Sequence, residues 1–541
     1  MKVMLRHTVL LFILAVSFSN CAKKGSPTGG AKDTIAPQIV SSSPQNFATN
    51  FTETQIKIGF DEYIKLKNIK ENLIISPPLT YDPLLSPQTS SRTLGIKIMD
   101  TLAPETTYVF NFGKSIVDNN EENPYDYFKY VFSTGSFIDS LTLSGAVYPA
   151  DRPSLEDSAT LLLYEATEPK QDSMVFKQRP RYVATTFDKT SEFNFSNLKP
   201  GAYYLVALQE DLNNYSFEPQ TDLIGFLPDP ITLPTDSSFV LRLFQETPDF
   251  KWTRASHSGK NRIVFGFQGA HEKYKITPLF EPPADFDFAW TKKPGVDSLN
   301  YWFKPAFDLE QSDTLYFKAQ SPWSTDTLTL KLRDLYVDSL KVSLNNTSVI
   351  LARDTIALSA NTPIRRIDPE KIILINRDSV VLPFTTQIDT LNNTALLLTD
   401  KTDDELYRLN LLPGALFDFF EQTHDSLNFA FRTKPLSDYG TLKLTLEEPV
   451  NYPVIVELVD QNLNIVAHKW LAQNEIVYFD YIPPSKYRVR LIEDHNENKL
   501  WDTGHYLQQR QPEIIVYMPG ILDIRANWSL NEVFPRTTGA K

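Results

Sequence analysis

Cysteine and histidine are scarce in this chain of 541 residues. The single cysteine, Cys21, has no partner for an intrachain disulfide, because disulfides need pairs. The seven histidines are scattered and never form the H-E-x-x-H spacing of a zinc site. Phosphate-binding loops, dinucleotide fingerprints and the G-x-S-x-G elbow of serine hydrolases are also missing. The sequence therefore predicts a protein that is not an enzyme, with no catalytic residues and no cofactor.

An excess of basic residues is missing too. Lys and Arg number 53 against 66 Asp and Glu, which gives a net charge of −13. No long basic block occurs anywhere in the chain. Because binding to nucleic-acid phosphates needs clustered Lys and Arg, we expect no nucleic-acid partner.

Long hydrophobic runs are absent after residue 20. The one apolar run, "TVLLFILAVSFS", follows the positive start "MKVMLRH" and is too short to span a bilayer as a helix. This pattern is typical of a signal peptide over residues 1–20. The cysteine that follows resembles the lipobox of bacterial lipoproteins, which implies that Cys21 carries a lipid after cleavage. Asn20 stands where that family usually has Gly, Ala or Ser, and simple secretion with a stray cysteine is the alternative.

Residues 21–35 form a Gly, Ser, Pro and Lys spacer that cannot bury a core. This segment, "CAKKGSPTGGAKDTI", resembles the tether of Bacteroidetes envelope lipoproteins. The resemblance implies an outer-membrane lipoprotein held by its N-terminal lipid, since each buried methylene contributes about 0.8 kcal/mol. Many surface-exported members carry acidic residues here, whereas this chain has Lys23 and Lys24. Whether the protein faces the periplasm or the cell surface stays open.

Glycine is sparse as well, with 19 residues against 37 prolines, and 12% of the chain is aromatic. This balance favours strands, strand ends and rigid turns. Runs such as "TQIKIGF", "LGIKIMD" and "KYRVRLIE" alternate apolar and polar residues, as strands with one buried face do. No segment shows an apolar helical stripe over three turns. The sequence predicts an all-β protein, with tandem β-sandwiches in an elongated array.

Two kinds of module can be distinguished by short motifs. Residues 36–136, with "APQIVSSSPQN", "IKIGFDEYI" and "YVFSTG", resemble the bacterial Ig-like domain. Residues 137–247, with "FNFSNLKPGAYYLVAL", resemble the transthyretin-like sandwiches of carboxypeptidase-regulatory and collagen-binding B-type domains. The Ig-like resemblance implies a spacer or binding module without catalytic residues.

Both modules recur later in the chain. Tyr108 and Thr134 are 26 residues apart, as are Tyr407 and Thr433, and "YRVRLIEDHNENKLWDTG" echoes "YYLVALQEDLNNYSFEPQTD". Repetition of whole modules favours an additive architecture over one compact enzyme. The expected domains are a signal peptide (1–20), a lipidated tether (21–35), an Ig-like domain (36–136), a transthyretin-like sandwich (137–247), a strand-rich domain of unclear type (248–337), a second Ig-like domain (338–436), a second transthyretin-like sandwich (437–531) and a tail (532–541).

One loop of the last module has the residues of a calcium site. In "EDHNENKLWDTG", Asp494, Asn496 and Asn498 lie two apart and Asp502 follows, so four side chains offer oxygen ligands. An EF-type loop would also have a central glycine and a closing bidentate glutamate, which this loop lacks. The alternative is that these residues cap a turn between two strands. Calcium binding and a purely structural turn both stay open.

A tripeptide of Asp, then Ser or Thr, then an apolar residue or Thr occurs thirteen times, against about two expected from average residue usage. It resembles the O-glycosylation acceptor of exported Bacteroidetes proteins, which implies sugar on some of these hydroxyls. The alternative is that Asp and Ser end turns just before a strand begins. The acceptor residues are Thr34, Thr101, Ser140, Ser158, Ser173, Ser298, Thr314, Thr327, Ser339, Thr355, Ser379, Thr390 and Ser426.

The function that these features favour is a non-enzymatic lipoprotein of the outer membrane that acts as a scaffold or binding module. Its partner would be an envelope protein, as in a transport or assembly complex, or a polysaccharide. The alternative is a carbohydrate-active or accessory enzyme component with a site in residues 248–337. Aromatic stretches there, such as "ADFDFAW" and "LNYWFKP", are candidates for a sugar platform, but their alternation favours core packing.

Overall fold

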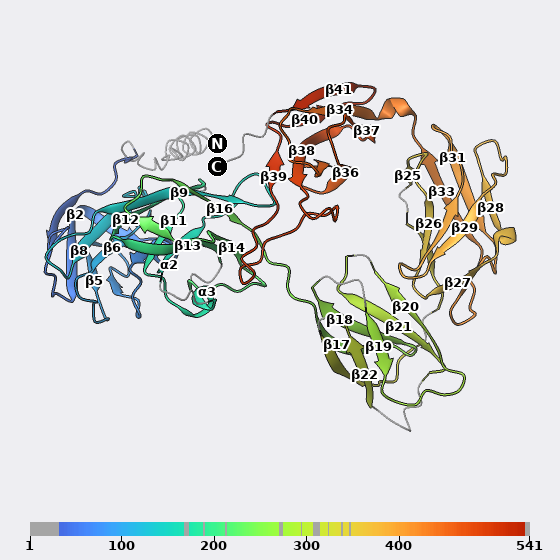
Figure 1. The fold of residues 1–541 in the computed structure, drawn as a ribbon, viewed down its shortest axis with the longest axis horizontal. Coiled ribbons are helices and arrows are strands. Elements are labelled where there is room, and N and C mark those ends of the chain that lie inside the picture. Colours follow the sequence, from blue (N-terminus) through green and yellow to red (C-terminus); the bar gives the residue numbers. More distant parts are fainter. Residues whose placement is uncertain are drawn as a thin grey trace, which may run out of the picture. The chain divides into compact units, whose positions relative to one another are not determined.

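The computed structural model describes residues 32–166, 172–187, 190–210, 214–269, 274–293, 295–306, 314–322, 324–336, 339–345 and 348–535. Strands make up 49% of the structure and helices 3%, and Figure 1 shows strands throughout the described chain, which confirms the all-β prediction. The helical segments are α2 (Ile69–Asn72), α3 (Met174–Lys177) and the 3-10 turns η1 (Pro369–Lys371) and η2 (Leu436–Asp438). None of these described helices has the length and apolarity needed to cross a membrane.

The chain divides into two compact units. The first holds the described residues up to Thr142 with the short segments 181–183 and 196–199, and the second holds the others. The described strands form β-sandwiches, which we number 1 to 5 along the chain. Sandwich 1 belongs to the first unit, and sandwiches 2 to 5 belong to the second apart from the short segments just named. Cys21, the signal peptide and residues 536–541 lie outside the described residues.

Sandwich 1 consists of two sheets with the strand orders β1-β2-β5-β4 and β3-β6-β8, and β7 pairs with the end of β2. Its strands are β1 (Ile39–Ser43), β2 (Gln55–Leu66), β3 (Ile74–Ser76), β4 (Leu84–Ser86), β5 (Ser91–Lys97), β6 (Thr107–Asn111), β7 (Ile116–Asp118) and β8 (Lys129–Ser133). Strand β2 buries alternate residues, including Ile56, Ile58 and Phe60, as its period-two pattern predicts. They share one core with Phe110 and Phe132 of the second sheet. Each such side chain contributes about 1.5–3 kcal/mol on burial, so this core stabilises the face-to-face packing.

Sandwich 2 has the strand orders β11-β10-β13-β14, with β15 also paired to β13, and β12-β9-β16. Its strands are β9 (Leu141–Pro149), β10 (Thr160–Glu165), β11 (Tyr182–Thr185), β12 (Glu192–Leu198), β13 (Gly201–Gln209), β14 (Leu223–Phe226), β15 (Ile231–Leu233) and β16 (Phe239–Leu243). Strand β16 runs parallel to β9. All residues from Tyr203 to Leu208 of β13 are buried, so both faces of this sheet are covered.

Sandwich 5 repeats this arrangement strand for strand. Its strand orders are β36-β35-β38-β39, with β40 also paired to β38, and β37-β34-β41, and β41 runs parallel to β34. Its strands are β34 (Gly440–Leu446), β35 (Val454–Val459), β36 (Ile465–Leu471), β37 (Val477–Ile482), β38 (Ser485–Glu493), β39 (Ile515–Tyr517), β40 (Leu522–Ile524) and β41 (Ser529–Phe534). Each of β9 to β16 therefore has a counterpart among β34 to β41 in the same order and pairing.

Sandwich 3 has the strand orders β17-β18-β21-β20 and β19-β22-β23. Its strands are β17 (Lys251–Gly259), β18 (Arg262–Gln268), β19 (Lys275–Pro278), β20 (Asp287–Lys292), β21 (Ser298–Lys304), β22 (Thr314–Gln320) and β23 (Thr325–Lys331). Its core is rich in aromatic rings: Tyr301 contacts Phe265 and Phe317 edge to face, with centroids 6.1 and 5.8 Å apart. Edge-to-face contacts suit the quadrupoles of the rings and hold this core together.

Sandwich 4 has the strand orders β24-β26-β30-β29 and β25-β33-β31-β28, with a separate pair β27-β32. Its strands are β24 (Val342–Leu344), β25 (Val349–Ile350), β26 (Ile356–Ala360), β27 (Ile364–Ile367), β28 (Ile372–Ile375), β29 (Thr385–Asp389), β30 (Thr394–Leu398), β31 (Leu406–Leu411), β32 (Leu416–Asp418) and β33 (Leu427–Thr433). Its two main sheets enclose a single apolar core that includes Leu358, Leu397, Leu409 and Phe431.

A hydrogen-bonded corner built on a tyrosine occurs in both sandwich 1 and sandwich 4. In sandwich 1 the Tyr108 hydroxyl accepts the N–H of Ala103 at 2.9 Å, and the Thr134 hydroxyl donates to the Ala103 carbonyl at 2.7 Å. In sandwich 4 the Tyr407 hydroxyl accepts the N–H of Thr402 at 2.8 Å.

The threonine of this corner also has its counterpart in sandwich 4. The Thr433 hydroxyl donates to the Thr402 carbonyl at 2.6 Å. Each tyrosine stacks on a phenylalanine, with centroids 5.5 Å apart for Tyr108 and Phe132 and 5.4 Å apart for Tyr407 and Phe431. The equal sequence spacing thus corresponds to one repeated network.

Candidate functional site

The four residues of the calcium prediction are brought together by the loop after β38. Asp494 is fully buried, and its carboxylate accepts the indole N–H of Trp470 at 2.8 Å and the backbone N–H of Lys499 at 3.0 Å. The side-chain amides of Asn496 and Asn498 each donate to Asp502 Oδ2 at 2.7 Å. The sequence therefore identified a real cluster.

The oxygens of this cluster are already occupied by N–H groups. Asn496 Oδ1 accepts the backbone N–H of Asn498 at 3.0 Å, and Asn498 Oδ1 accepts that of Leu500 at 2.7 Å. Such bonds are those of Asx turns, which Asn and Asp form between strands. Across the described part of the chain, no three His, Cys, Asp or Glu side chains are grouped to hold a metal ion. The network fits a self-contained turn, and calcium at these residues stays a prediction.

A further buried carboxylate, Glu513 in the segment before β39, stabilises the same loop. Glu513 accepts the backbone N–H of His495 at 2.9 Å and that of Asp502 at 3.0 Å. Its carbonyl also accepts the indole N–H of Trp501 at 3.0 Å. Burial raises the pKa of Glu513, and the two N–H bonds oppose that rise. The loop is thus fixed by carboxylates that receive backbone donors.

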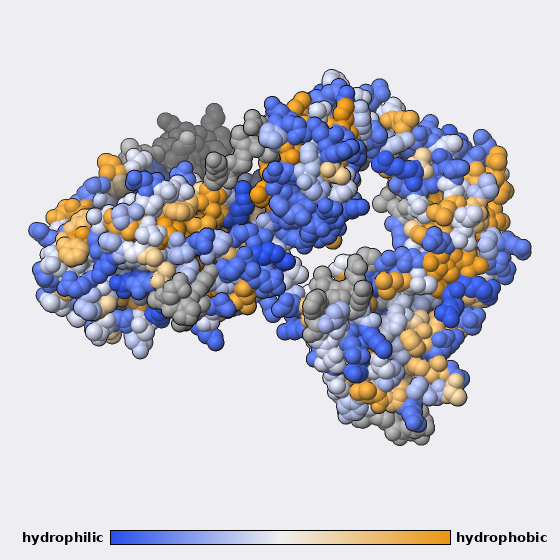
Figure 2. All heavy atoms as spheres, viewed as in Figure 1, coloured by the Kyte–Doolittle hydropathy of each residue, from blue (hydrophilic) through white to orange (hydrophobic). Residues whose placement is uncertain are grey.

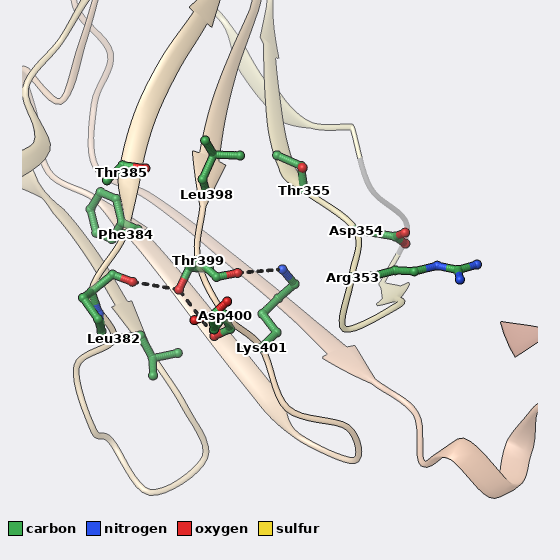
Figure 3. A pocket seen from close by; sticks show the side chains of 11 residues that line it. Arg353, Asp354, Thr355, Leu382, Phe384, Thr385, Leu398, Thr399, Asp400 and Lys401 are labelled. Carbon is green, nitrogen blue, oxygen red and sulfur yellow. Dashed lines mark hydrogen bonds between the residues drawn. The ribbon is translucent and has the colours of Figure 1, made fainter. Parts of the chain in front are cut away.

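An open groove of about 600 Å³ lies in sandwich 4 (Figure 3). Its lining residues are Arg353, Asp354, Thr355, Leu382, Pro383, Phe384, Thr385, Leu398, Thr399, Asp400 and Lys401. The Thr399 hydroxyl donates to the Pro383 carbonyl at 2.8 Å, and Lys401 Nζ donates to the Thr399 carbonyl at 3.2 Å. Burial lowers the pKa of Lys401, although Asp354 and Asp400 counteract it.

The lining of this groove combines charged, polar and apolar residues. It includes two cations, two carboxylates, three threonines and four apolar residues. Reasoning from sequence missed the groove, because its residues come from three separate turns. The triplet Asp354-Thr355-Ile356 was the only pattern that touched it.

A smaller pocket of about 370 Å³ lies in sandwich 1. Its lining residues are Glu62, Tyr63, Ser90, Arg92, Asn119 and Asn120. The Arg92 guanidinium lies over the Tyr63 ring, 5.3 Å from its centroid, and Tyr63 is 55% exposed. Burial and the nearby carboxylates of Asp118 and Asp61 raise the pKa of Glu62. This pocket also went unnoticed in the sequence.

The predicted O-glycosylation acceptors lie at the surface of the described chain. Nine are exposed, namely Thr34, Thr101, Ser140, Ser158, Thr327, Ser339, Ser379, Thr390 and Ser426. Four are half-buried, namely Ser173, Ser298, Thr314 and Thr355. Several of the preceding aspartates hold turns, since Asp354 accepts the N–H of Leu351 at 2.8 Å and Asp389 accepts that of Asn392 at 3.0 Å. Both interpretations of the triplets are compatible with these positions.

The aromatic stretches of residues 248–337 are mostly core. Trp252 is 6% exposed, Tyr301 1%, Trp302 3% and Phe303 0%. In "ADFDFAW", by contrast, Phe288 is 48% exposed, and Phe286 and Trp290 are only half-buried. Core packing thus accounts for the aromatic residues of "LNYWFKP", whereas those of "ADFDFAW" lie partly at the surface. Figure 2 shows hydrophobic and hydrophilic residues interspersed over the visible surface.

Comparison with known proteins supports the Ig-like interpretation of sandwich 1. Residues 33–134 match the bacterial Ig-like domain family. No curated protein matches the chain. Among solved structures, domains 1–6 of the surface layer protein SbsC are 12% identical with a TM-score of 0.14, over 86% of this chain and 66% of that one. The chain thus spans just under two thirds of that fragment.

Two further solved structures are similar at the same low level. The major pilin subunit BcpA of Bacillus cereus is 10% identical with a TM-score of 0.14, over 73% of this chain and 99% of that one. A titin fragment is 10% identical with a TM-score of 0.15, over 53% of this chain and 98% of that one. At these identities and TM-scores, the comparison gives no evidence of a shared function.

Proposed function

We propose that this protein is a non-enzymatic envelope lipoprotein whose repeated sandwiches act as a scaffold or binding module. The observation that carries the proposal is the repetition of structural networks along the described part of the chain. The tyrosine corner recurs in sandwiches 1 and 4, and sandwich 5 repeats the strand order of sandwich 2. Such repetition suits a spacer built by adding modules. The match of residues 33–134 to the bacterial Ig-like domain agrees with a structural or binding role.

The proposed anchor is a lipid on Cys21, which lies outside the described residues. It is supported by the short apolar run before this cysteine and by the absence of any other cysteine in the sequence. We expect Cys21→Ser to move the protein from the membrane fraction to the soluble fraction and to abolish labelling with an alkyne fatty acid. A wild-type protein that is unlabelled and soluble would refute the anchor.

The proposed partner is an envelope protein or a polysaccharide near the outer membrane. The balanced charges and apolar side chains of the sandwich 4 groove support a binding role for this surface. Purification in gentle detergent, compared between wild type and the paired substitution Arg353→Ala with Lys401→Ala, tests it. We expect one partner to co-purify with wild type and to be depleted from the variant. Repeated purification of the wild-type protein alone would count against a partner.

We also propose that some exposed triplets carry O-linked sugar. The exposure of nine of the thirteen acceptors supports this, and the turn bonds of Asp354 and Asp389 support the purely structural alternative. Mass spectrometry of the native protein separates the two. We expect sugar at exposed Thr327 rather than at half-buried Thr314. An intact mass that exceeds the polypeptide only by the lipid would exclude glycosylation.

A further inference from the structure

The segment that follows the Asx loop of sandwich 5 packs on sandwich 2. The Thr503 hydroxyl donates to the Gln245 carbonyl at 2.6 Å, although the two residues are 258 positions apart. The Gln511 side-chain amide donates to the Phe226 carbonyl at 3.0 Å. The backbone N–H of Tyr506 donates to the carboxylate of Glu246, a residue that is only 8% exposed. We name residues 503–511 the docking segment.

Tyr506 is the centre of this contact. It is 1% exposed, and its ring meets Phe226 edge to face with centroids 5.2 Å apart. Phe176 approaches the same ring at 6.1 Å. Both phenylalanines belong to the sandwich 2 part of the chain, so the tyrosine is buried by residues far away in sequence. Aromatic rings inserted into such pockets commonly dominate the energy of an interface.

Gly504 fits this contact because it has no side chain. A Cβ at this position would lie 2.4 Å from the tip of the Phe244 ring. Any larger residue must push that ring away, and Phe244 is itself only 2% exposed. The close approach explains why a glycine stands at the start of the docking segment.

A second contact joins the same two sandwiches at the Asp151 carbonyl, beside an ion pair of sandwich 5. Arg490 Nε donates to Glu457 at 2.6 Å, and these side chains are only 12% and 9% exposed. Arg490 Nη1 also donates to the Asp151 carbonyl at 3.3 Å, and the Tyr517 hydroxyl donates to that carbonyl at 2.7 Å. A desolvated ion pair is costly unless further hydrogen bonds satisfy its groups. The Asp151 carbonyl of sandwich 2 supplies such a bond.

Part of the outer face of the larger sheet of sandwich 5 is apolar. Ile455, Ile492 and Ile515 are at most 6% exposed and form a cluster of their own with Trp470, Trp501 and Tyr517, apart from the main core. All six residues of β35 are buried. An antiparallel sheet with one solvent face would instead alternate buried and exposed residues. This face is therefore built to be covered.

We infer that sandwiches 2 and 5 are locked together by the docking segment and act as one body. The partner that this surface fits is thus another module of the same chain. Both ends of the segment 248–436, which includes sandwiches 3 and 4, are then attached to this single body. This inference is independent of the lipid anchor and of any external partner.

The lock is tested by cleaving the chain and measuring whether the two fragments separate. A site for a sequence-specific protease is inserted after Leu436, which is 56% exposed at the entrance to sandwich 5. After cleavage of the purified full-length chain, size-exclusion chromatography under native conditions reports whether the fragment from 437 onwards stays bound. We expect it to stay bound in the otherwise unaltered protein.

Two substitutions should release the fragment. Tyr506→Ala removes the buried ring, and Gly504→Leu adds atoms where Phe244 lies, so each should weaken retention at least tenfold. Leu507→Ala is the matched control, because this neighbour in the docking segment is 51% exposed. Gln508→Ala is a second control, since this side chain of the docking segment is exposed as well. Both controls should leave the fragment bound.

Two results of the cleavage experiment would contradict the lock. Release from the unaltered protein, or retention in both Tyr506→Ala and Gly504→Leu, would overturn the lock. Release in the controls as well would show that the docking segment is not what holds the fragment. Circular dichroism of each uncleaved variant monitors folding. If a variant loses its strand signal, the milder pair Thr503→Ala with Gln511→Ala replaces it, and the expected result is the same.

Discussion

Sandwiches 1 and 4 and the sandwich pair 2 and 5 repeat in different ways. Sandwiches 1 and 4 keep a hydrogen-bond corner almost atom for atom, with matching bonds from Tyr108 and Tyr407. Sandwiches 2 and 5 keep their strand order but differ in the loop after the long central strand. In sandwich 2 Glu210 accepts the N–H groups of Asn214 and Tyr215, whereas in sandwich 5 Asp494 takes the central position. The hydrogen-bonded corner is thus the same in its two copies, whereas the loop after the long central strand differs between its two copies.

The largest expected loss of stability comes from substitutions in the tyrosine corner that sandwiches 1 and 4 share. We expect Tyr108→Ala and Tyr407→Ala each to destabilise its own sandwich by about 3–5 kcal/mol, since both rings are almost fully buried. Tyr→Phe, which removes only the hydroxyl, should cost about 1 kcal/mol in either copy. Guanidinium unfolding of the full chain, followed by hydrogen exchange in each sandwich, measures both. If the losses of unfolding free energy in Tyr108→Ala and Tyr407→Ala differed twofold, the two corners would not be equivalent.

The two loops should respond unequally to the loss of one buried carboxylate each. Asp494→Ala leaves the Trp470 indole and the Lys499 N–H without their acceptor, so we expect a loss of about 2–3 kcal/mol in sandwich 5. Asp222→Ala in sandwich 2 removes the bonds from Glu218 and Thr221, and about 1 kcal/mol is expected.

Asp494→Asn provides the control for shape, because it keeps one acceptor oxygen and should lose less than the alanine variant. Thermal unfolding monitored by the fluorescence of Trp470 and Trp501 reports on sandwich 5 directly. Equal losses of unfolding free energy in Asp494→Ala and Asp222→Ala would show that the two loops contribute equally to stability.

The pH dependence of stability should be the same in both copies, despite their different loops. Burial raises the pKa of Glu210 in sandwich 2 and of Glu513 in sandwich 5 above the ordinary value of 4.5. A raised pKa means that the folded state binds the proton more tightly than the unfolded state. Stability should therefore fall as pH rises from about 4.5 through the folded pKa, and stay level above it.

Glu210→Gln and Glu513→Gln should each flatten that slope in one sandwich only. Denaturant midpoints between pH 4 and 8 provide the measurement. A slope of opposite sign, with stability rising over this range and the rise lost in the Gln variants, would mean that the N–H bonds to these carboxylates outweigh burial.

Sequence patterns predicted the strands well because each sandwich face obeys local rules. Alternation in β2 marks Ile56 and Ile58 as core, and the 26-residue spacing of the tyrosine corners reflects a real network. Burial of Tyr301 and Phe303 in β21 followed from the same alternation. The cluster of Asp494, Asn496, Asn498 and Asp502 was also found, because all four lie within one turn.

Features that join distant segments could not be predicted in this way. The sandwich 4 groove combines three turns, and Tyr506 is buried by Phe226 and Phe176 from another sandwich. Nothing local distinguishes "GHYLQQRQ" from an ordinary polar loop. The one available signal was the absence of alternation in β35, where "VIVELV" is buried on both faces. A continuous apolar strand in a sandwich indicates that something covers its outer side.

The smallest expected effect decides what the Asx loop is for. Asn496 and Asn498 already donate to Asp502, and their own oxygens accept backbone N–H groups, so calcium would have to displace these bonds. We expect 1 mM calcium to leave the unfolding midpoint of sandwich 5 unchanged, with magnesium as the control. A ligand present at a hundred times its Kd would instead stabilise the folded state by about 2.7 kcal/mol. If such a rise occurs and disappears in Asp502→Ala, the loop is a calcium site, and the metal also braces the docking segment that begins one residue later.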